Sequence, residues 1–154
     1  HGGRRMTVRR AVFEDIPRLV ELAAMEHAMS RFASTPFNEQ VASHAFAQAV
    51  RAMHMVVFFS GGGYLAGMVQ PMLFHRGWNA YELAWFAQDG SGMALLRAFK
   101  DWASSMRAQE VVVHNYAGVI EERRMSRALS RHGFKPVGSS YAHAVAQQEA
   151  AWQH

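Results

Sequence analysis

The sequence predicts a mixed α/β (α+β) fold, in which a central, mostly antiparallel sheet of six to seven strands is flanked by about four helices. Two observations support this class. Half of the 154 residues are hydrophobic, which suits one domain with its own core. Helical and strand periodicities follow one another along the chain in the order β-α-α-β-β-β-α-β-α-β-β.

The N-terminal half supplies the first six elements. Residues 7–11 alternate as a strand, and Pro17 suits the first turn of a helix that Asp15 and Ile16 open. A second helix is expected over about 41–53. The strands that follow are expected at 55–59 and 64–74, and then at 80–87.

The C-terminal half predicts a helix that begins near Met93, a strand at 110–114 and a helix at 121–131 that Gly133 ends. Two closing strands are expected at 134–137 and 141–146. No linker or repeat interrupts residues 6–146, so these are expected to form a single domain. Residues 1–5, which precede Met6, are interpreted as a remnant of an added expression sequence or as a disordered segment, and residues 147–154 as a C-terminal tail.

A glycine-rich turn between the strand at 80–87 and the next helix is the most informative local feature. Its residues Gly90, Ser91 and Gly92 precede Met93. The first N–H groups of a helix have no internal partner and carry positive potential, and glycine lets a phosphate approach the backbone closely. The turn therefore predicts a site for a pyrophosphate-bearing ligand.

Composition excludes several classes of function. The chain has no cysteine, so disulfides and thiolate metal sites are excluded. No apolar run is long enough to span a bilayer, so no membrane contact is expected, and the absence of cysteine fits a reducing cytoplasmic setting. No two of the nine histidines are spaced i, i+4 on an expected helix, the spacing that places two metal ligands on one face, which argues against a metal site. A basic stripe at Arg123, Arg127 and Arg131 fits a solvated face, an acidic partner or a cofactor phosphate, but no nucleic-acid reader motif accompanies it.

Four stretches of the chain together resemble the GCN5-related N-acetyltransferase superfamily (GNAT). They are residues 7–19, 63–69, 90–103 and 132–138. The stretch from Ala94 to Ala103 is most similar to small phage-encoded members. The resemblance implies a GNAT-like fold and acetyl-CoA as co-substrate. It also implies that Trp85, Phe86 and Ala87 pair through their backbone with pantetheine, and that Gly90, Ser91, Gly92 and Met93 donate N–H groups to pyrophosphate.

The catalytic residues expected from the resemblance are Glu82, which lies on the strand before the turn, and His114. Attack by an amine requires its neutral form, so a carboxylate or histidine near the thioester serves as general base. The acceptor pocket is expected to include Met25, Met29 and Phe32, with Trp78 on one side. The acceptor would be a small-molecule or protein amine.

Two departures from the family pattern support an alternative. Ala87 stands where the family usually has Arg or Gln before the turn, and Leu129 stands where many members have a proton-donating tyrosine. The strand-to-helix connection is also short. The leading hypothesis is an N-acetyltransferase that works by direct attack in a ternary complex. The alternative is a catalytically degenerate GNAT-fold binding or structural protein, for example a phage virion component with a protein partner. Edge strands leave a homodimer open.

Overall fold

The structure is a computed structural model that describes residues 7–74 and 76–146. The chain divides into two compact units, residues 1–120 and 121–154. The single domain expected over residues 6–146 stays a prediction. The segments 1–5 and 147–154, for which a remnant and a tail were expected, lie outside the described residues.

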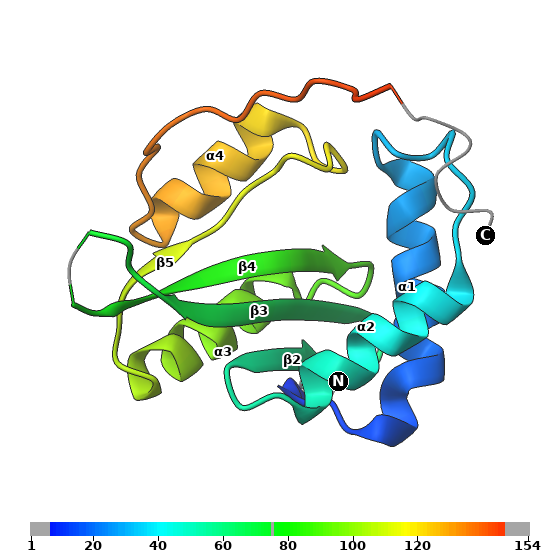
Figure 1. Ribbon diagram of the computed structural model, residues 1–154, viewed down its shortest axis with the longest axis horizontal. Helices are drawn as coiled ribbons and strands as arrows, with labels where there is room; N and C mark the ends of the chain where they lie inside the picture. The colour runs from blue at the N-terminus through cyan, green and yellow to red at the C-terminus, as the bar shows by residue number, and fades with distance from the viewer. Residues whose placement is uncertain (1–6, 75, 147–154) are drawn as a thin grey trace, which may run out of the picture. The chain divides into compact units, whose positions relative to one another are not determined.

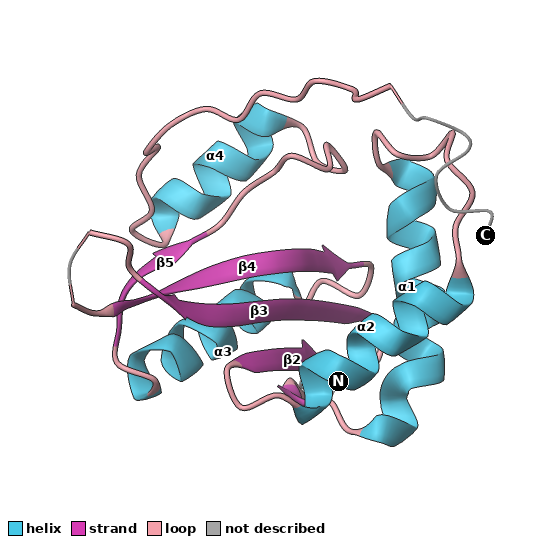
Figure 2. Cartoon of the chain, in the orientation of Figure 1, coloured by secondary structure: helices cyan, strands magenta, loops and turns pink. Residues whose placement is uncertain are grey.

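The first unit contains one sheet and three α-helices (Figures 1 and 2). The sheet has the strand order β1-β2-β3-β4-β5. Its strands are β1 (Arg9–Arg10), β2 (Met55–Phe59), β3 (Gly63–Pro71), β4 (Trp78–Ala87) and β5 (Ala108–Val112). The helices are α1 (Ile16–Met29), α2 (Glu39–Arg51) and α3 (Gly92–Ser105), and a 3-10 turn, η1 (Phe13–Asp15), precedes α1. All pairings are antiparallel except that of β4 with β5.

Strands β4 and β5 separate halfway along β4. Strand β4 pairs with β3 over its whole length, from Trp78 to Ala87. It pairs with β5 only from Trp78 to Tyr81. At the same level the register with β3 shifts by one residue, which leaves Leu83 without an opposing partner. Such a bulge increases the local twist and redirects side chains. The β5 side of β4 is therefore unpaired from Glu82 onward.

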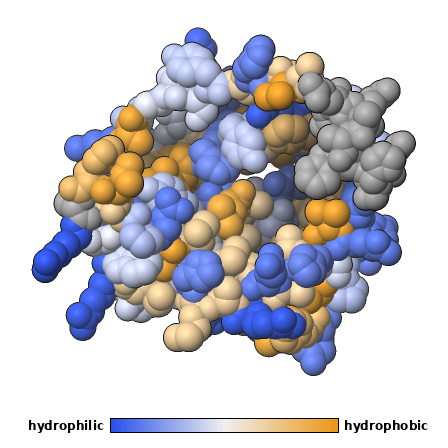
Figure 3. Space-filling view, viewed as in Figure 1, coloured by the Kyte–Doolittle hydropathy of each residue, from blue (hydrophilic) through white to orange (hydrophobic). Residues whose placement is uncertain are grey.

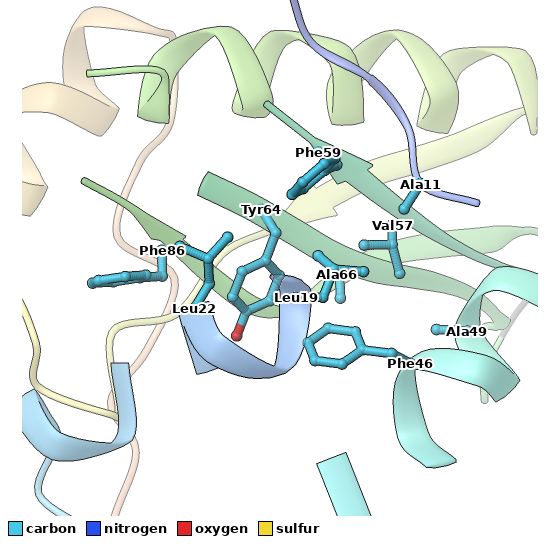
Figure 4. Close-up of a cluster of buried hydrophobic side chains, with 10 residues drawn as sticks. All are labelled: Ala11, Leu19, Leu22, Phe46, Ala49, Val57, Phe59, Tyr64, Ala66 and Phe86. Atoms are coloured by element: carbon cyan, nitrogen blue, oxygen red, sulfur yellow. The ribbon is translucent and has the colours of Figure 1, made fainter. Parts of the chain in front are cut away.

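The sheet carries an apolar layer on each face. Helices α1 and α2 cover one face, where a cluster of ten buried side chains forms the core (Figure 4). Its members are Ala11, Leu19, Leu22, Phe46, Ala49, Val57, Phe59, Tyr64, Ala66 and Phe86. Helix α3 covers the opposite face (Figure 1), and its predicted stripe is confirmed because Leu95, Leu96, Phe99 and Trp102 are buried.

Local signals place the ends of these elements. Asn38 precedes α2 and its side chain accepts a hydrogen bond from the Val41 N–H at 3.0 Å, which caps the helix. Pro17 lies at the start of α1, as the sequence predicts. Strand β3 ends at Pro71, three residues before the predicted end. The chain turns there, with Met72 N–H donating to the Gly77 carbonyl at 3.0 Å.

The second unit contains helix α4 (Glu122–Arg131), followed by Gly133 with φ +84°. The strands expected at 134–137 and 141–146 are wrong, since both segments are irregular (Figure 2). No described strand pairs with either segment, and Tyr141 is 93% exposed. A segment in which apolar and polar residues alternate becomes a strand only when a neighbouring strand supplies hydrogen-bond partners for its backbone. The described sheet accordingly has five strands instead of six to seven.

Exposed apolar side chains are scattered over the molecule. In Figure 3 apolar and polar residues are intermixed on the visible face. The strongly exposed ones include Val41, Met53 and Leu73. No helix among the described residues has the length and apolar character needed to cross a bilayer.

Candidate active site

Glu82 occupies the point where β4 and β5 separate. Glu82 is only 2% exposed. Its Oε1 atom accepts a hydrogen bond from the His114 backbone N–H at 3.2 Å, and the His114 Nδ1 atom lies 3.9 Å from the same oxygen. His114 follows β5 by two residues, because that strand ends at Val112 and not at the predicted residue 114. The structure therefore brings together the two residues that were expected to be catalytic.

The surroundings of Glu82 keep its carboxyl group protonated up to an unusually high pH. Burial raises the pKa of Glu82 to about 8, against the opposing hydrogen bond from His114. Burial also lowers the pKa of His114, so the imidazole is held neutral. A carboxyl group with a pKa near 8 is basic enough to accept a proton from an amine as it reacts.

A second carboxylate, Glu26 of α1, interacts electrostatically with Glu82. The Tyr64 hydroxyl donates a hydrogen bond to Glu26 Oε2 at 2.7 Å. Burial raises the pKa of Glu26, and the charge of Glu26 contributes to the raised pKa of Glu82. Sequence reasoning missed this residue. The available signal was its spacing from Leu19 and Leu22, which places a carboxylate on the buried stripe of α1.

The glycine-rich turn after β4 is organised around Asp89. Its carboxylate accepts hydrogen bonds from the Ser91 N–H at 3.1 Å and the Gly62 N–H at 3.2 Å. It also accepts one from the Ser60 hydroxyl at 2.8 Å. Burial raises the pKa of Asp89, but the hydrogen bonds from Ser91 and Ser60 outweigh this effect and hold it below its usual value. The Ser91 N–H, which was expected to face a phosphate, is thus committed to Asp89.

The first turn of α3 keeps other donors available. Its first intrahelical hydrogen bond runs from the Leu95 N–H to the Ser91 carbonyl at 2.9 Å. The N–H groups of Gly92, Met93 and Ala94 therefore precede any intrahelical acceptor. Gly90 adopts φ +79°, a conformation that favours glycine. A methyl group at Gly92 would meet Trp85 and Ala87 only at 3.9 to 4.0 Å, so the absence of a side chain there is not imposed by packing.

The three residues expected to pair with pantetheine line the unpaired side of β4. The Trp85 indole N–H donates to the Gly92 carbonyl at 3.1 Å, which fixes the ring against the start of α3. The Phe86 side chain belongs to the core cluster (Figure 4). Ala87 is the last residue of the strand. The side chains of Trp85 and Phe86 are thus engaged elsewhere, and β5 does not pair with the backbone of any of the three residues.

The residues expected in the acceptor pocket lie in different places. Phe32 belongs to the site, since its ring lies 5.9 Å from the ring of Tyr116, which in turn lies 4.7 Å from the His114 ring. Met25 contributes to an open groove between α1 and α2, and Met29 is largely exposed at the end of α1. Trp78 lies at the other end of β4, where β4 and β5 are paired, and so does not border the separated part.

Three further observations concern side chains that could take part in chemistry. In the described part of the chain no group of three His, Asp or Glu residues is arranged to hold a metal ion. Leu129 lies on α4, where an aliphatic side chain has no proton to donate. Tyr116 is the tyrosine whose ring touches His114.

Comparison with known proteins identifies the fold. The sequence matches no protein-family model and no curated protein significantly. An aminoglycoside N-acetyltransferase in complex with CoA superposes with a TM-score of 0.71 at 13% identity, over 94% of this chain and 97% of that chain. Glucosamine-6-phosphate N-acetyltransferase from Arabidopsis thaliana gives a TM-score of 0.69 at 10% identity, over 91% and 98%. An integron cassette protein from the metagenome of Cole Harbour Salt Marsh gives 0.69 at 20% identity, over 92% and 91%.

These similarities, together with the separation of β4 from β5, define a mixed α+β fold of the acetyltransferase type. The chain has the fold of the GCN5-related N-acetyltransferases, as the sequence predicts.

Proposed function

We propose that this chain is an N-acetyltransferase that transfers an acetyl group from acetyl-CoA to a primary amine by direct attack in a ternary complex. The observation that carries the proposal is the position of Glu82. A buried carboxyl group with a pKa of about 8 lies where β4 leaves β5, next to an unpaired strand edge. Perturbed, buried acids at such positions are typical of catalytic sites.

In this reaction Glu82 acts as the general base, directly or through a water molecule. The amine nitrogen forms a bond to the acetyl carbon, the carbon–sulfur bond breaks, and the sulfur leaves as a thiolate. The proton that the nitrogen loses passes to the Glu82 carboxylate. His114 keeps the carboxylate in place through its backbone N–H, at 3.2 Å from Oε1. The chain has no cysteine, so an acyl-enzyme intermediate linked through a cysteine thioester is excluded.

The turn and β4 fit acetyl-CoA, which supplies the activated acetyl group. The N–H groups of Gly92 and Met93 would bind the pyrophosphate, assisted by the positive end of α3. The unpaired backbone from Trp85 to Ala87 offers hydrogen bonds to an extended amide-containing chain. One of the unpaired N–H groups on this edge would stabilise the oxyanion that forms on the acetyl carbonyl.

The hydrogen bonds that Asp89 accepts within the turn favour a second function. Its carboxylate places a negative charge at the turn and takes one of the expected phosphate donors, Ser91. Together with Leu129, this supports a GNAT-fold protein that has lost catalysis and binds another protein. That alternative predicts no affinity for acetyl-CoA.

Calorimetric titration with acetyl-CoA separates these functions. We expect micromolar binding by the wild type and a loss of at least tenfold in Gly92→Glu, because the new carboxylate faces the pyrophosphate at a position with room for a side chain. Gly138→Glu is the matched control, since it introduces the same charge at a glycine where no atom of the described residues lies within 4 Å of the added carbon. Absence of binding at millimolar acetyl-CoA would refute the acetyltransferase proposal and favour the binding protein.

A further inference from the structure

Arg31 is a fixed guanidinium group at the edge of the site. It lies two residues after α1 ends at Met29, and its backbone N–H donates to the Ala117 carbonyl at 2.9 Å. Its side-chain Nε donates to the Tyr116 carbonyl at 2.7 Å. These bonds join the connection after α1 to the connection after β5, which lie side by side in Figure 1. The position of the guanidinium is thereby determined by two segments that are far apart in sequence.

Two aromatic rings lie next to this guanidinium. Its central carbon lies 4.4 Å from the Phe32 ring centroid and 5.4 Å from that of Tyr116. Contacts of this kind between arginine and aromatic faces are attractive. Within residues 7–74 and 76–146 only the Nε of this guanidinium has a hydrogen-bond acceptor, and no carboxylate forms an ion pair with Arg31. Arg9 and Arg18, by contrast, form ion pairs with the nearby carboxylates of Asp15 and Glu21.

The free end of Arg31 belongs to the same corner as Glu82. The Tyr116 ring on which it lies contacts the His114 ring at 4.7 Å, and the His114 backbone donates to Glu82. The guanidinium and the carboxyl group are therefore connected through the neighbouring rings of Tyr116 and His114, and the His114 Nδ1 atom lies 3.9 Å from Glu82 Oε1. A small molecule can contact both groups at once.

We propose that Arg31 binds an anionic group of the acceptor, so that the substrate is an amine that also carries a carboxylate or a phosphate. This inference rests on the proposed acetyltransferase function. A guanidinium presents paired N–H groups that match the two oxygens of either anion. Because Tyr116 and Phe32 already fix the group, little conformational entropy is lost on binding. Glu82 then receives the proton from the amine at the other end of the molecule.

Matched acceptor pairs test the proposal. The first pair is 4-aminobutyrate and butylamine, and the second is 2-aminoethyl phosphate and ethanolamine; each pair shares its amine and differs in the anion. We expect the wild type to acetylate the anionic member of at least one pair with a kcat/KM about 10- to 100-fold higher, mainly through a lower KM. The pair that shows the preference distinguishes carboxylate from phosphate.

Substitutions assign the preference to Arg31. In Arg31→Gln the preference should disappear, because kcat/KM falls mainly for the anionic member of the pair, and Arg31→Lys should retain part of the preference. Arg51→Gln is the matched control, because Arg51 also lies over an aromatic ring, that of Phe13, at 5.7 Å. It should retain the preference. Equal losses for both members of a pair in Arg31→Gln would indicate a structural role and overturn the proposal.

A binding readout separates this proposal from the proposed function. The same pairs are titrated calorimetrically against the wild type and Arg31→Gln without acetyl-CoA. Tighter binding of an anionic member that Arg31→Gln abolishes supports the anion site, even if no amine is acetylated, and in that case the acetyltransferase function alone fails. Equal binding of both members of each pair, with or without turnover, overturns the anion site.

Discussion

The buried carboxyl group of Glu82 makes the stability of the protein depend on pH. An ordinary glutamate has a pKa of 4.5, whereas burial raises that of Glu82 to about 8. Between these values the unfolded chain has released the proton and the folded chain has retained it. The folded state binds more protons, so the free energy of unfolding falls as pH rises from about 5 to 8. Each pH unit contributes up to about 1.4 kcal/mol.

The substitution Glu82→Gln removes this dependence while keeping the shape of the side chain. At pH 5, where Glu82 is protonated, the two proteins should differ by only about 1 kcal/mol. By pH 8 the wild type should have lost about 4 kcal/mol relative to the variant, as an upper limit. The contribution of Asp89, which lies in the turn after β4, is present in both proteins and largely cancels in this difference.

Urea unfolding at pH 5, 6, 7 and 8 measures the difference directly. Glu21→Gln is the control, since the Glu21 side chain is 64% exposed and forms only a surface ion pair with Arg18. Its stability should follow the wild type at every pH. If the curves of wild type and Glu82→Gln stay parallel from pH 5 to 8, Glu82 is ionised throughout this range and the reasoning about the site is refuted.

Two further substitutions test how the site is supported. Asp89→Ala should lower the free energy of unfolding by about 1 to 3 kcal/mol in urea, because it leaves the Ser91 and Gly62 N–H groups without their acceptor. Since the pKa of Asp89 is lowered, this difference should be largest at neutral pH and decrease as pH falls below about 4 and the carboxylate is protonated. Gly67→Ala should cost a similar amount, because the added methyl group would overlap the Phe99 ring behind the sheet. The double variant with Phe99→Leu should recover part of that loss in thermal unfolding, and no recovery would place the strain elsewhere.

Much of the fold follows from local patterns in the sequence. The apolar stripe of α3 and the short strand β2 are predicted because their periodicity coincides with burial. The prediction of two closing strands is wrong for a physical reason. The residue pattern around Val137 and Tyr141 is compatible with strands, but a local pattern does not show whether a neighbouring strand is available for pairing.

The site is predictable only in part, because its pairings depend on tertiary contacts. Glu82 and His114 were found through a family pattern, and the structure places them together. The partner of Glu26 is a tyrosine 38 positions away, and that of Arg31 lies 85 positions away. No local pattern encodes such pairs. A carboxylate on the buried stripe of α1 was nevertheless a signal that could have indicated Glu26.

The pH dependence of acetyl transfer tests the central claim most directly. The acceptor is chosen so that its amine is already neutral at pH 6 and adds no titration of its own. For the wild type, kcat/KM should rise with pH and level off above about 8, where Glu82 is ionised. Glu82→Gln should be at least about 100-fold slower and lose this dependence. A variant that keeps the wild-type rate and profile would contradict the assignment of Glu82 as the base.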